Sequence, residues 1–492
     1  MFLVLFLSVI ALYLFHELYW KRRNLPPGPI PLPIFGNLLS LNNPPPGTDA
    51  FTRWTKQYGD VFTFWMGSAP LVTINSYETL KNTFLRDADT YTNKKYQPLN
   101  DMIRGGDYGI MESNGELWRD HRRFILTTFR DFGLGKNLMQ EKILLEVEDM
   151  FQKLDEKLGT ETDVPHFMEV SLANVINQIM FGYRFDKDRM DEFRKVKKFI
   201  DAPVEVFSTF TAFLRMFVPS LSFLIIGDGF EKNVEEMKTL MYGFVNGQIE
   251  DHRRKIDYDS MESTDYVECY LKEQRKREKE GDKESFNDRQ LANMCTDLWF
   301  AGLLTTTNTL TWAVAYQMNY DGVQAKIHEE LDRVIGSDRI ITTADKNYLP
   351  YMNAFINETQ RCLNVVPLNL QHETTRDTTI SGYFIPKGTG VIAQIGTVLT
   401  DENIFKNAEV FNPERFLENG KLKKVEELIP FSIGKRNCLG EGLARMELFL
   451  FIANFYHRYK VTPGSTGIPH LRKETVNVIH PRAFNIILEK RH

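Results

Sequence analysis

The chain has 492 residues, of which 42% are hydrophobic, and this is enough to bury a large core. Its net charge of −5 and pI of about 6.1 argue against a general nucleic-acid-binding protein, which would carry a strong basic excess. Only four cysteines are present and none forms a C-x-x-C pair, so neither a zinc cage nor an iron–sulfur cluster is predicted. So few cysteines also give no disulfide framework, which is typical of a reducing compartment.

Residues 1–20 are almost continuously apolar and predict a transmembrane anchor. The first fifteen, MFLVLFLSVIALYLF, hold one polar side chain, Ser8, and about 20 helical residues span roughly 30 Å of hydrocarbon. The alternative is a cleaved signal peptide, which would place basic residues before the apolar run and a small-residue cleavage site after it. Here Lys21, Arg22 and Arg23 follow the run. We therefore expect a single uncleaved anchor, with the rest of the chain in the cytosol.

Residues 21–33 form a basic and proline-rich linker that includes LPPGPIPLP. Prolines favour an extended, stiff backbone, so we expect a spacer between the anchor and a globular body. Beyond it, residues 60–67 and 70–76 alternate in polarity like two paired strands around a turn.

Most of the remaining chain has helical periodicity. Apolar residues recur every three to four positions over 141–158 and 230–255, and residues 287–318 form one long helical pattern with a Thr-rich middle. Strand-like pieces return at 378–397. The sequence thus predicts one large body over residues 34–492, mainly α with a minor β region.

Residues 203–225 are unusually apolar for a cytosolic body. Phe207, Phe210, Phe213 and Phe217 stand at helical spacing. Two interpretations are open: a helix that faces the core, or a lid over an apolar cavity that also dips into a membrane. A proline interrupts the run, so we do not expect a second membrane span.

The segment FSIGKRNCLG, residues 431–440, places one cysteine between glycines and basic residues, directly before a helical pattern. Cys438 therefore lies near a helix N-terminus, where backbone N–H groups and the helix dipole stabilise a thiolate. Gly434 and Gly440 permit tight turns and the close approach of a flat group. Arg436 offers a fixed cation for a carboxylate. One thiolate beside such an arginine suits a haem iron and the haem propionates.

This loop resembles the haem-binding loop of the cytochrome P450 family, FxxGxRxCxG. The matching positions are Phe431, Gly434, Arg436, Cys438 and Gly440. The resemblance, which is nearest to the microsomal xenobiotic- and lipid-oxidising members, implies the P450 fold with one haem-thiolate domain behind the anchor. It also implies that Cys438 binds the iron, with Phe431, Arg436 and Gly440 as further haem-binding residues.

Two more motifs of the family concern a structural network. Glu358 and Arg361 match ExxR in NETQR, and Arg415 matches the arginine of the PERF-type motif in NPERF. An i,i+3 pair on a helix is often only a surface salt bridge. The resemblance instead implies a buried network of all three behind the haem.

Further matches concern the haem propionates. Trp118 and Arg122 match WxxxR and are four positions apart, so on a helix both can face one ligand. His372 matches a position that reaches a propionate in the family, although a lone histidine in a strand is usually structural. The resemblance implies that these three bind the cofactor. Arg104 is offset from the corresponding family position and is left out of the expected set.

On the oxygen side, AGLLTT at 301–306 matches the family motif AGx(D/E)T(T/S). The resemblance implies that Ala301 and Gly302 leave room for dioxygen and that Thr305 assists proton delivery. The alternative for the threonine is a hydrogen bond to the preceding helical turn. Leu304 departs from the motif, because the family usually has an acid there. Weaker coupling, with more peroxide released, is the expected consequence.

The family resemblance implies a membrane-anchored monooxygenase that contains haem b and inserts one oxygen atom into a lipophilic small molecule. NADPH–cytochrome P450 reductase would supply electrons, with cytochrome b5 as an optional second partner, at the endoplasmic reticulum membrane and without nucleic acid. By the same resemblance the cavity is lined by residues 98–113, the Phe-rich segment, Ala301, Thr305, residues 365–370, and the tip near Ala483 and Phe484.

The sequence leaves two alternative functions open. Leu304 favours a haem-thiolate isomerase or dehydratase of lipid peroxides, which needs no reductase, whereas Thr305 counts against it. A haem-binding sensor or carrier without turnover is the third hypothesis.

Overall fold

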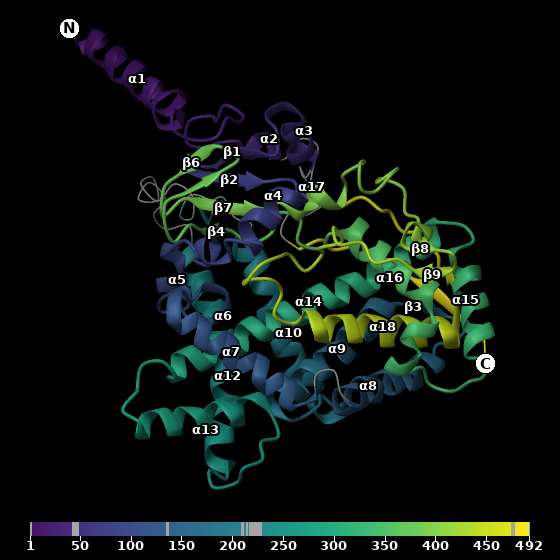
Figure 1. The fold of residues 1–492 in the computed structure, drawn as a ribbon. Helices are drawn as coiled ribbons and strands as arrows, with labels where there is room; N and C mark the ends of the chain where they lie inside the picture. Colours follow the sequence, from purple (N-terminus) through teal and green to yellow (C-terminus); the bar gives the residue numbers. More distant parts are fainter. Residues whose placement is uncertain are drawn as a thin grey trace.

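The computed structural model describes residues 2–41, 49–133, 137–207, 211–212, 215, 229–473 and 478–491. Figure 1 shows a mainly helical body with its largest sheet on the side from which the N-terminal helix projects. The helices are α1 (Phe2–Leu18), α2 (Leu38–Leu41), α3 (Asp49–Tyr58), α4 (Tyr77–Leu80), α5 (Pro98–Ile103), α6 (Gly109–Glu112), α7 (Gly115–Asp131), α8 (Asn137–Asp155), α9 (Val164–Phe181), α10 (Met190–Phe207), α12 (Phe230–Lys255), α13 (Tyr266–Lys279), α14 (Asp288–Asn319), α15 (Val323–Val334), α16 (Pro350–Leu363), α17 (Ile395–Leu399) and α18 (Glu441–Arg458). Short helical turns are η1 (Trp20–Arg22), η2 (Lys81–Leu85), η3 (Ala88–Tyr91), η4 (Lys187–Arg189), η6 (Thr343–Tyr348) and η7 (Pro413–Phe416).

The strands form four small sheets. They are β1 (Val61–Met66), β2 (Ala69–Ile74), β3 (Glu161–Thr162), β4 (His372–Glu373), β5 (Thr378–Ile380), β6 (Tyr383–Ile385), β7 (Gly390–Ala393), β8 (Leu417–Glu418), β9 (Lys421–Leu422), β10 (Tyr459–Pro463) and β11 (Ile486–Lys490). The largest sheet has the order β1-β2-β7-β4, in which only β2 and β7 are parallel. A second sheet has the order β10-β11-β3.

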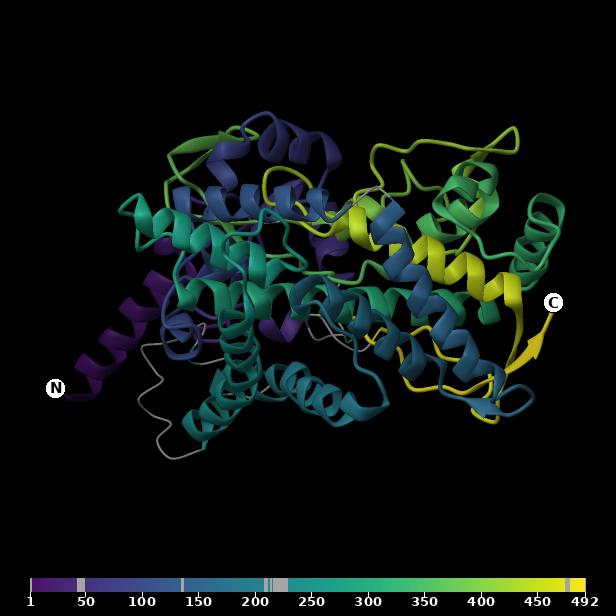
Figure 2. The ribbon, with the colours of Figure 1, turned by 90° about the horizontal axis from the view of Figure 1, so that it is seen from below.

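Helix α14 is the axis of the body. Its 32 residues make a rod of about 48 Å. Asn287 caps its start by accepting a hydrogen bond from the backbone N–H of Gln290 at 2.9 Å. Because the helix is buried on nearly all sides, it has no separate polar and apolar face and buries polar as well as apolar side chains. It packs against α9, α18 and α16, and Figure 2 shows it crossing the molecule beside α18.

The predictions for the long helices agree closely with the structure. Residues 230–255 coincide with α12, and 287–318 differ from α14 by one residue at each end. The pair of strands expected at 60–67 and 70–76 is the antiparallel hairpin β1–β2. The last part of 378–397 is not a strand, because α17 begins at Ile395. The Phe-rich segment 203–225 lies largely outside the described residues, and so do the side chains of the four phenylalanines at helical spacing.

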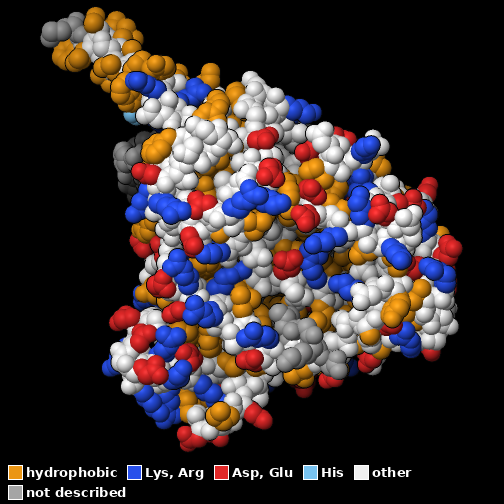
Figure 3. Space-filling model, in the orientation of Figure 1, with side chains coloured by type: hydrophobic (Ala, Val, Ile, Leu, Met, Phe, Trp, Pro, Cys, Tyr) orange, Lys and Arg blue, Asp and Glu red, His pale blue; other side chains and the backbone are white. Residues whose placement is uncertain are grey.

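The N-terminal helix projects away from the body and is covered with apolar side chains (Figure 3). Among the described residues it belongs to the one helix long and apolar enough to cross a membrane, Phe2–Arg22, with a mean hydropathy of 2.0 and no buried residues. Length and composition alone support this statement.

The linker after the anchor, expected as a stiff spacer, packs against the body. Pro27 O accepts the backbone N–H of Thr63 in β1 at 3.0 Å. A Cβ on Gly28 would lie 1.8 Å from Thr63 O, so only glycine permits this close approach. The Lys21 ammonium stands 4.7 Å from the centre of the Trp65 ring. The proline-rich segment is therefore attached along the edge strand of the main sheet.

Candidate functional site

The cysteine loop is a tight turn that feeds directly into α18. The Cys438 N–H donates to Phe431 O at 2.9 Å, which closes the loop, and Gly440 stands immediately before the helix. Gly434 has φ of +90°, and a Cβ there would lie 2.4 Å from Phe84 O. A larger residue is excluded on both grounds. The prediction that Cys438 lies near a helix N-terminus is confirmed.

Cys438 is surrounded by protein, yet its side chain borders open space. Burial raises the pKa of this thiol, whereas the backbone N–H of Gly440 acts in the opposite direction. The sequence suggested that the helix N-terminus would stabilise the thiolate. In the structure the pKa of the free thiol is raised instead, because the effect of desolvation is larger than that of the helix N-terminus. A second charge-stabilising partner, such as a metal ion, is needed to favour the thiolate.

The central helix also faces open space at one place. Ala301 is exposed and Thr305 half-buried, although Leu303 and Leu304 beside them are buried. Exposure in the middle of an otherwise buried core helix requires an internal hollow. Exposure of Cys438 and exposure of Ala301 are each what a flat group held between the loop and α14 would require.

Arg436 is buried against Trp118 in a shell of carbonyl oxygens. Its guanidinium donates to Thr92 O at 2.7 Å, Ile110 O at 3.2 Å and Ser113 O at 2.6 Å. Its centre lies 3.9 Å from the centre of the Trp118 ring. Burial and then the nearby Arg122 lower its pKa to about 9.

Two further cations stand beside this arginine. Arg122 donates to Asn437 O at 3.0 Å and Asn437 Oδ1 at 2.7 Å, and thus ties α7 to the cysteine loop. Lys94 donates to Gln371 O at 2.8 Å, and burial followed by the charge of Arg436 lowers its pKa to about 7. Within the described ranges no carboxylate forms an ion pair with Lys94, Arg122 or Arg436; we call these three residues the cation cluster.

Two residues beside the cation cluster, Trp118 and His372, carry polar groups that could bind a ligand. The indole N–H of Trp118 is buried without a partner among the described residues. The Nδ1 of His372 lies 2.9 Å from Tyr91 O, and burial and then Lys94 hold the pKa of this histidine well below its usual range. Three cations without a carboxylate partner, and a buried N–H without an acceptor, in the described part of the chain fit a group with carboxylates. The residues present therefore fit the two propionates of a haem.

Lys94 is a site residue that the sequence analysis missed. Its hydrogen-bond partner Gln371 is 277 positions away. One lysine in the segment TNKKY gives no local pattern that singles it out. Its burial beside Arg436 is visible only in the fold.

The structure brings Glu358, Arg361 and Arg415 together; we call them the ion network. Both carboxylate oxygens of Glu358 accept from Arg361, at 2.7 and 2.8 Å, and Arg415 donates to Oε1 at 3.0 Å. Glu358 and Arg361 are fully buried. The remaining arginine N–H groups bind backbone carbonyls of residues 399–410. Helix α16 is thereby fastened to the segment that carries η7.

The small residues of α14 serve different purposes. Ala301 faces the hollow, and the Thr305 hydroxyl donates to Ala301 O at 2.8 Å, the bond to the preceding turn that was the alternative interpretation. Gly302 differs from expectation. A Cβ there would lie 2.6 Å from Ile176 Cδ1 of α9, so the glycine permits close packing of these helices. Of the two small residues, Ala301 is therefore the one that leaves open space beside the helix.

Leu304 stands where the family usually has an acid, and the nearby acid Asp297 is engaged elsewhere. Leu304 is 8% exposed and belongs to the main apolar core. Asp297 forms an ion pair with Arg104 at 2.7 Å and accepts the Met111 N–H at 2.9 Å, so both its partners are structural. Arg104 consequently lies outside the cation cluster, in agreement with its omission from the expected set.

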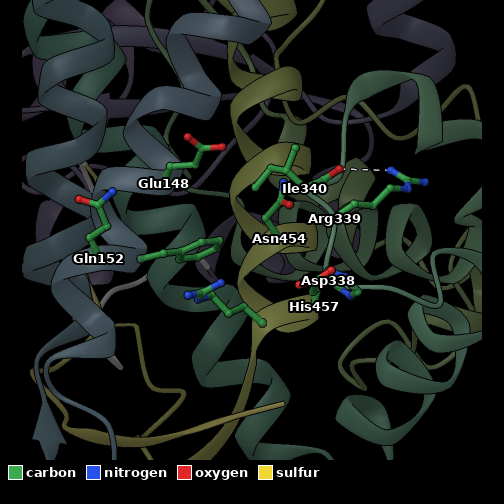
Figure 4. A pocket seen from close by; sticks show the side chains of 9 residues that line it. Glu148, Gln152, Asp338, Arg339, Ile340, Asn454 and His457 are labelled. Carbon is green, nitrogen blue, oxygen red and sulfur yellow. Dashed lines mark hydrogen bonds between the residues drawn. The ribbon is translucent and has the colours of Figure 1, made fainter. Parts of the chain in front are cut away.

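Two cavities lie elsewhere. One of about 280 Å³ stands between α8, α18 and the segment before η6. Figure 4 shows the side chains that line it, with the hydrogen bond that Arg339 donates to Ile340 O at 3.2 Å. The other, of about 530 Å³, lies between α5, α12 and α14. Its Asn293 precedes Ala301 by about two turns of α14.

Comparison with known proteins identifies the family. The family model of cytochrome P450 matches residues 26–488. Cytochrome P450 2C8 of Homo sapiens is 33% identical over 467 residues, which cover 93% of this chain and 92% of the relative. Cytochrome P450 2C7 of Rattus norvegicus is 35% identical over 468 residues, with 94% and 92% covered. Cytochrome P450 2E1 of Oryctolagus cuniculus is 35% identical over 458 residues, with 90% and 89% covered. The thiol loop, the cation cluster and the match along the whole body agree, and the chain belongs to the cytochrome P450 family, as a haem-dependent monooxygenase of the microsomal type.

Proposed function

We propose that this monooxygenase inserts one atom of O₂ into a lipophilic substrate, a fatty acid, steroid-like lipid or xenobiotic, with electrons from NADPH through NADPH–cytochrome P450 reductase. The observation that carries the proposal is that Cys438, Ala301 and Thr305 keep exposed or half-buried side chains on elements that are otherwise largely buried. A single thiol opposite small and hydroxyl-bearing residues of an apolar helix suits oxidation of an apolar molecule.

Haem b, bound without a covalent link, is the proposed form of the cofactor. Cys438 would hold its iron, and when bound the haem supplies an iron centre whose thiolate ligand favours cleavage of the O–O bond. Phe431 and Gly440 belong to the loop that would lie against one face. Arg122, Arg436 and Lys94 would bind the propionates, because each is a cation that lacks a carboxylate partner in the described chain.

Trp118 and His372 would complete this binding in different ways. Trp118 has a free N–H to donate. A neutral His372 whose Nδ1 donates to Tyr91 O carries no proton on Nε2. It can therefore donate to a propionate only when protonated, and a propionate beside it would favour that form by raising its pKa.

The chain's own residues would position the reaction. Ala301 leaves space at the helix surface, and Thr305 presents a hydroxyl there whose lone pairs can accept a hydrogen bond while its proton is held by Ala301 O. The buried ion network fixes α16 behind the site and takes no part in the chemistry. Its proposed role is structural.

The location and partners follow the same proposal. Residues 1–20 would anchor the protein in the endoplasmic reticulum membrane, residues 21–33 would join the anchor to the catalytic domain, and residues 34–492 would lie in the cytosol. Arg123 and Arg130 are exposed on α7, which donates Arg122 to the cysteine loop. They would form part of a basic face for the reductase and for cytochrome b5.

The test is reconstitution with NADPH, reductase and ¹⁸O₂ on a panel of fatty acids and lipophilic aromatics. We expect ¹⁸O in the product, dependence on NADPH, and a carbon monoxide difference spectrum typical of thiolate ligation. Cys438→Ser should abolish that spectrum, whereas Cys269→Ser, on α13, should not. Rearrangement of lipid hydroperoxides without NADPH, and without incorporation of label, would contradict the proposal and favour an isomerase.

A further inference from the structure

The C-terminal half of α14 carries a continuous series of aromatic rings. Trp312 and Tyr316 stand four residues apart on the helix, and their ring centres are 5.5 Å apart. Phe411 stacks on Tyr316, with 4.7 Å between the ring centres and 9° between the ring planes, and its ring centre lies 5.3 Å from that of Tyr320. Rings at such distances are in direct contact. We call Trp312, Tyr316, Phe411 and Tyr320 the aromatic column.

The aromatic column runs from the core to the surface. Trp312 is fully buried, Tyr316 and Phe411 are 5% and 3% exposed, and Tyr320, at the C-terminal end of α14, is half-buried. The indole N–H of Trp312 has no hydrogen-bond partner among the described residues. An oxidised Trp312 would therefore have no acceptor for its proton and would remain a buried cation, which is costly. Tyr320 borders solvent and can release its phenolic proton to water.

The inner end of the aromatic column lies on the face of α14 that carries Ala301 and Thr305. Trp312 follows Thr305 by seven residues and Ala301 by eleven, and both spacings are within about 20° of whole turns of the helix. Trp312 is thus about 10 Å from Thr305 along the helix axis. Ala301 and Thr305 are the exposed and half-buried residues of α14 that the proposed function places against the haem.

A second series of rings begins on the opposite side of α14. The ring of Trp299 lies 6.0 Å from that of Phe185, which lies 5.8 Å from that of Tyr183. Trp299 precedes Ala301 by two residues, a rotation of about 200°, so it points away from the Ala301 face. The Arg189 guanidinium lies 4.3 Å from the centre of the Tyr183 ring, and a cation there opposes removal of an electron from the ring. This series offers a control of the same residue types.

We propose that the aromatic column conducts single electrons from Tyr320 to the haem pocket and gives the enzyme a second activity, the reduction of peroxide by small thiols when no substrate is bound. The inference goes beyond monooxygenation. It requires the haem proposed above, but neither NADPH nor the reductase. The need for such an outlet follows from Leu304, which is expected to increase the release of peroxide. In a reducing compartment small thiols are the reductants at hand.

Each transfer moves one electron. Trp312 gives an electron to the cofactor that peroxide has oxidised, Tyr316 restores Trp312, and Tyr320 restores Tyr316 across Phe411. Tyr320 loses its phenolic proton with its electron, so its O–H bond breaks and a neutral tyrosyl radical remains. A thiol donates a hydrogen atom that forms the O–H bond again. After two transfers the two sulfur radicals join, and the protons released by Tyr320 are taken up in water: 2 RSH and H₂O₂ give RSSR and 2 H₂O.

The first test maps where the protein becomes oxidised. The haem-loaded full-length protein receives hydrogen peroxide and a phenol probe that couples to tyrosyl radicals, without substrate, NADPH or reductase, and mass spectrometry identifies the labelled positions. We expect label on Tyr320. Tyr348 of η6 is 69% exposed and Tyr183 ends the second series, and both should stay unlabelled. An oxidant that diffuses through solution would label the exposed Tyr348 first.

Variants of the aromatic column supply the second test. Trp312→Phe and Tyr316→Phe keep a ring in the core but remove the side chain that can be oxidised. Both should abolish the label on Tyr320, its tyrosyl radical in electron paramagnetic resonance and the oxidation of thiol, and the haem should bleach faster. Tyr183→Phe should behave like the wild type. In case Trp312→Phe does not fold, Tyr316→Phe, which removes only a hydroxyl group, still decides the question.

Label on Tyr348 in preference to Tyr320, or label on Tyr320 that persists in Trp312→Phe or Tyr316→Phe, would overturn the inference. Equal rates of haem bleaching in the wild type and in these variants would overturn it as well. Failure of the proposed function has a different signature. Label on Tyr320 together with a product that lacks ¹⁸O would contradict monooxygenation alone.

Discussion

Two buried groups of arginines and lysines in this protein differ in how their charge is compensated. In the ion network, Glu358 accepts from both arginines, and backbone carbonyls take the remaining N–H groups. In the cation cluster, Lys94, Arg122 and Arg436 have only carbonyl and amide partners within the described chain. The first group is complete when the chain folds, whereas the second is complete only when an anion binds. Charge balance thus separates residues that hold the fold from residues that hold a ligand.

The largest effect is expected from breaking the ion network. Arg361→Ala leaves the carboxylate of Glu358 buried, with Arg415 as its remaining ion-pair partner among the described residues. Removal of one member of a buried pair costs about 3–5 kcal/mol. We expect the free energy of unfolding in urea to fall by that amount and little haem protein to accumulate. A variant with wild-type stability would refute the structural role.

The second prediction concerns the cation cluster without its ligand. Because burial lowers the pKa of Lys94 to about 7 from an ordinary 10.5, the unfolded chain binds a proton that the folded chain lacks between these values. The stability of haem-free protein should therefore rise from about pH 7 toward pH 10.5, by at most about 1.4 kcal/mol per pH unit. With haem bound, the propionates favour the charged lysine and this slope should vanish. Urea titrations at several pH values, with Lys94→Met as control, measure both.

A smaller effect is expected at Trp118. Trp118→Phe keeps an aromatic ring under Arg436 and removes only the unpartnered N–H. A hydrogen bond to a charged group contributes about 1.5–3 kcal/mol. Haem should therefore dissociate about tenfold faster or more, measured by transfer to an acceptor protein, while the stability of the haem-free form stays the same. Equal dissociation rates would mean that the indole donates to no propionate.

The smallest effect is expected at Lys435, the sequence neighbour of Arg436. Its ammonium is exposed and pairs with Asp89 at 2.5 Å at the surface. Such pairs contribute about 0–1 kcal/mol. Lys435→Ala should accordingly leave both unfolding and haem retention within that range, and a large loss of haem would place Lys435 in the cation cluster.

Local patterns predicted the parts of this molecule whose causes are local. The helical periodicity of α12 and α14 and the tight turn of the cysteine loop depend on consecutive residues, and both predictions agree with the structure. Features that depend on distant partners were missed or misread. Lys94 acquires its role from Gln371, and Gly302 is set by Ile176 of another helix.

The same limit applies to the aromatic column. Along α14 its members appear as ordinary core residues, and only the contacts of Phe411 with Tyr316 and Tyr320 make the column continuous. The family motifs located the thiol and the ion network because each motif is a short segment. They did not show which charges remain without a partner, since that property depends on the whole fold.

The attachment of the linker to β1 determines how the anchor and the body move together. Lys21 stands on the Trp65 ring and Arg22 donates to Gly28 O at 3.0 Å, so little free chain separates α1 from the main sheet. In a membrane the catalytic body would then behave as a rigid extension of its anchor. One alanine inserted into α1 would turn the body by about 100° around the helix axis relative to the bilayer. The phase of a helix that has no buried residue would in this way set which surface of the enzyme faces the lipid.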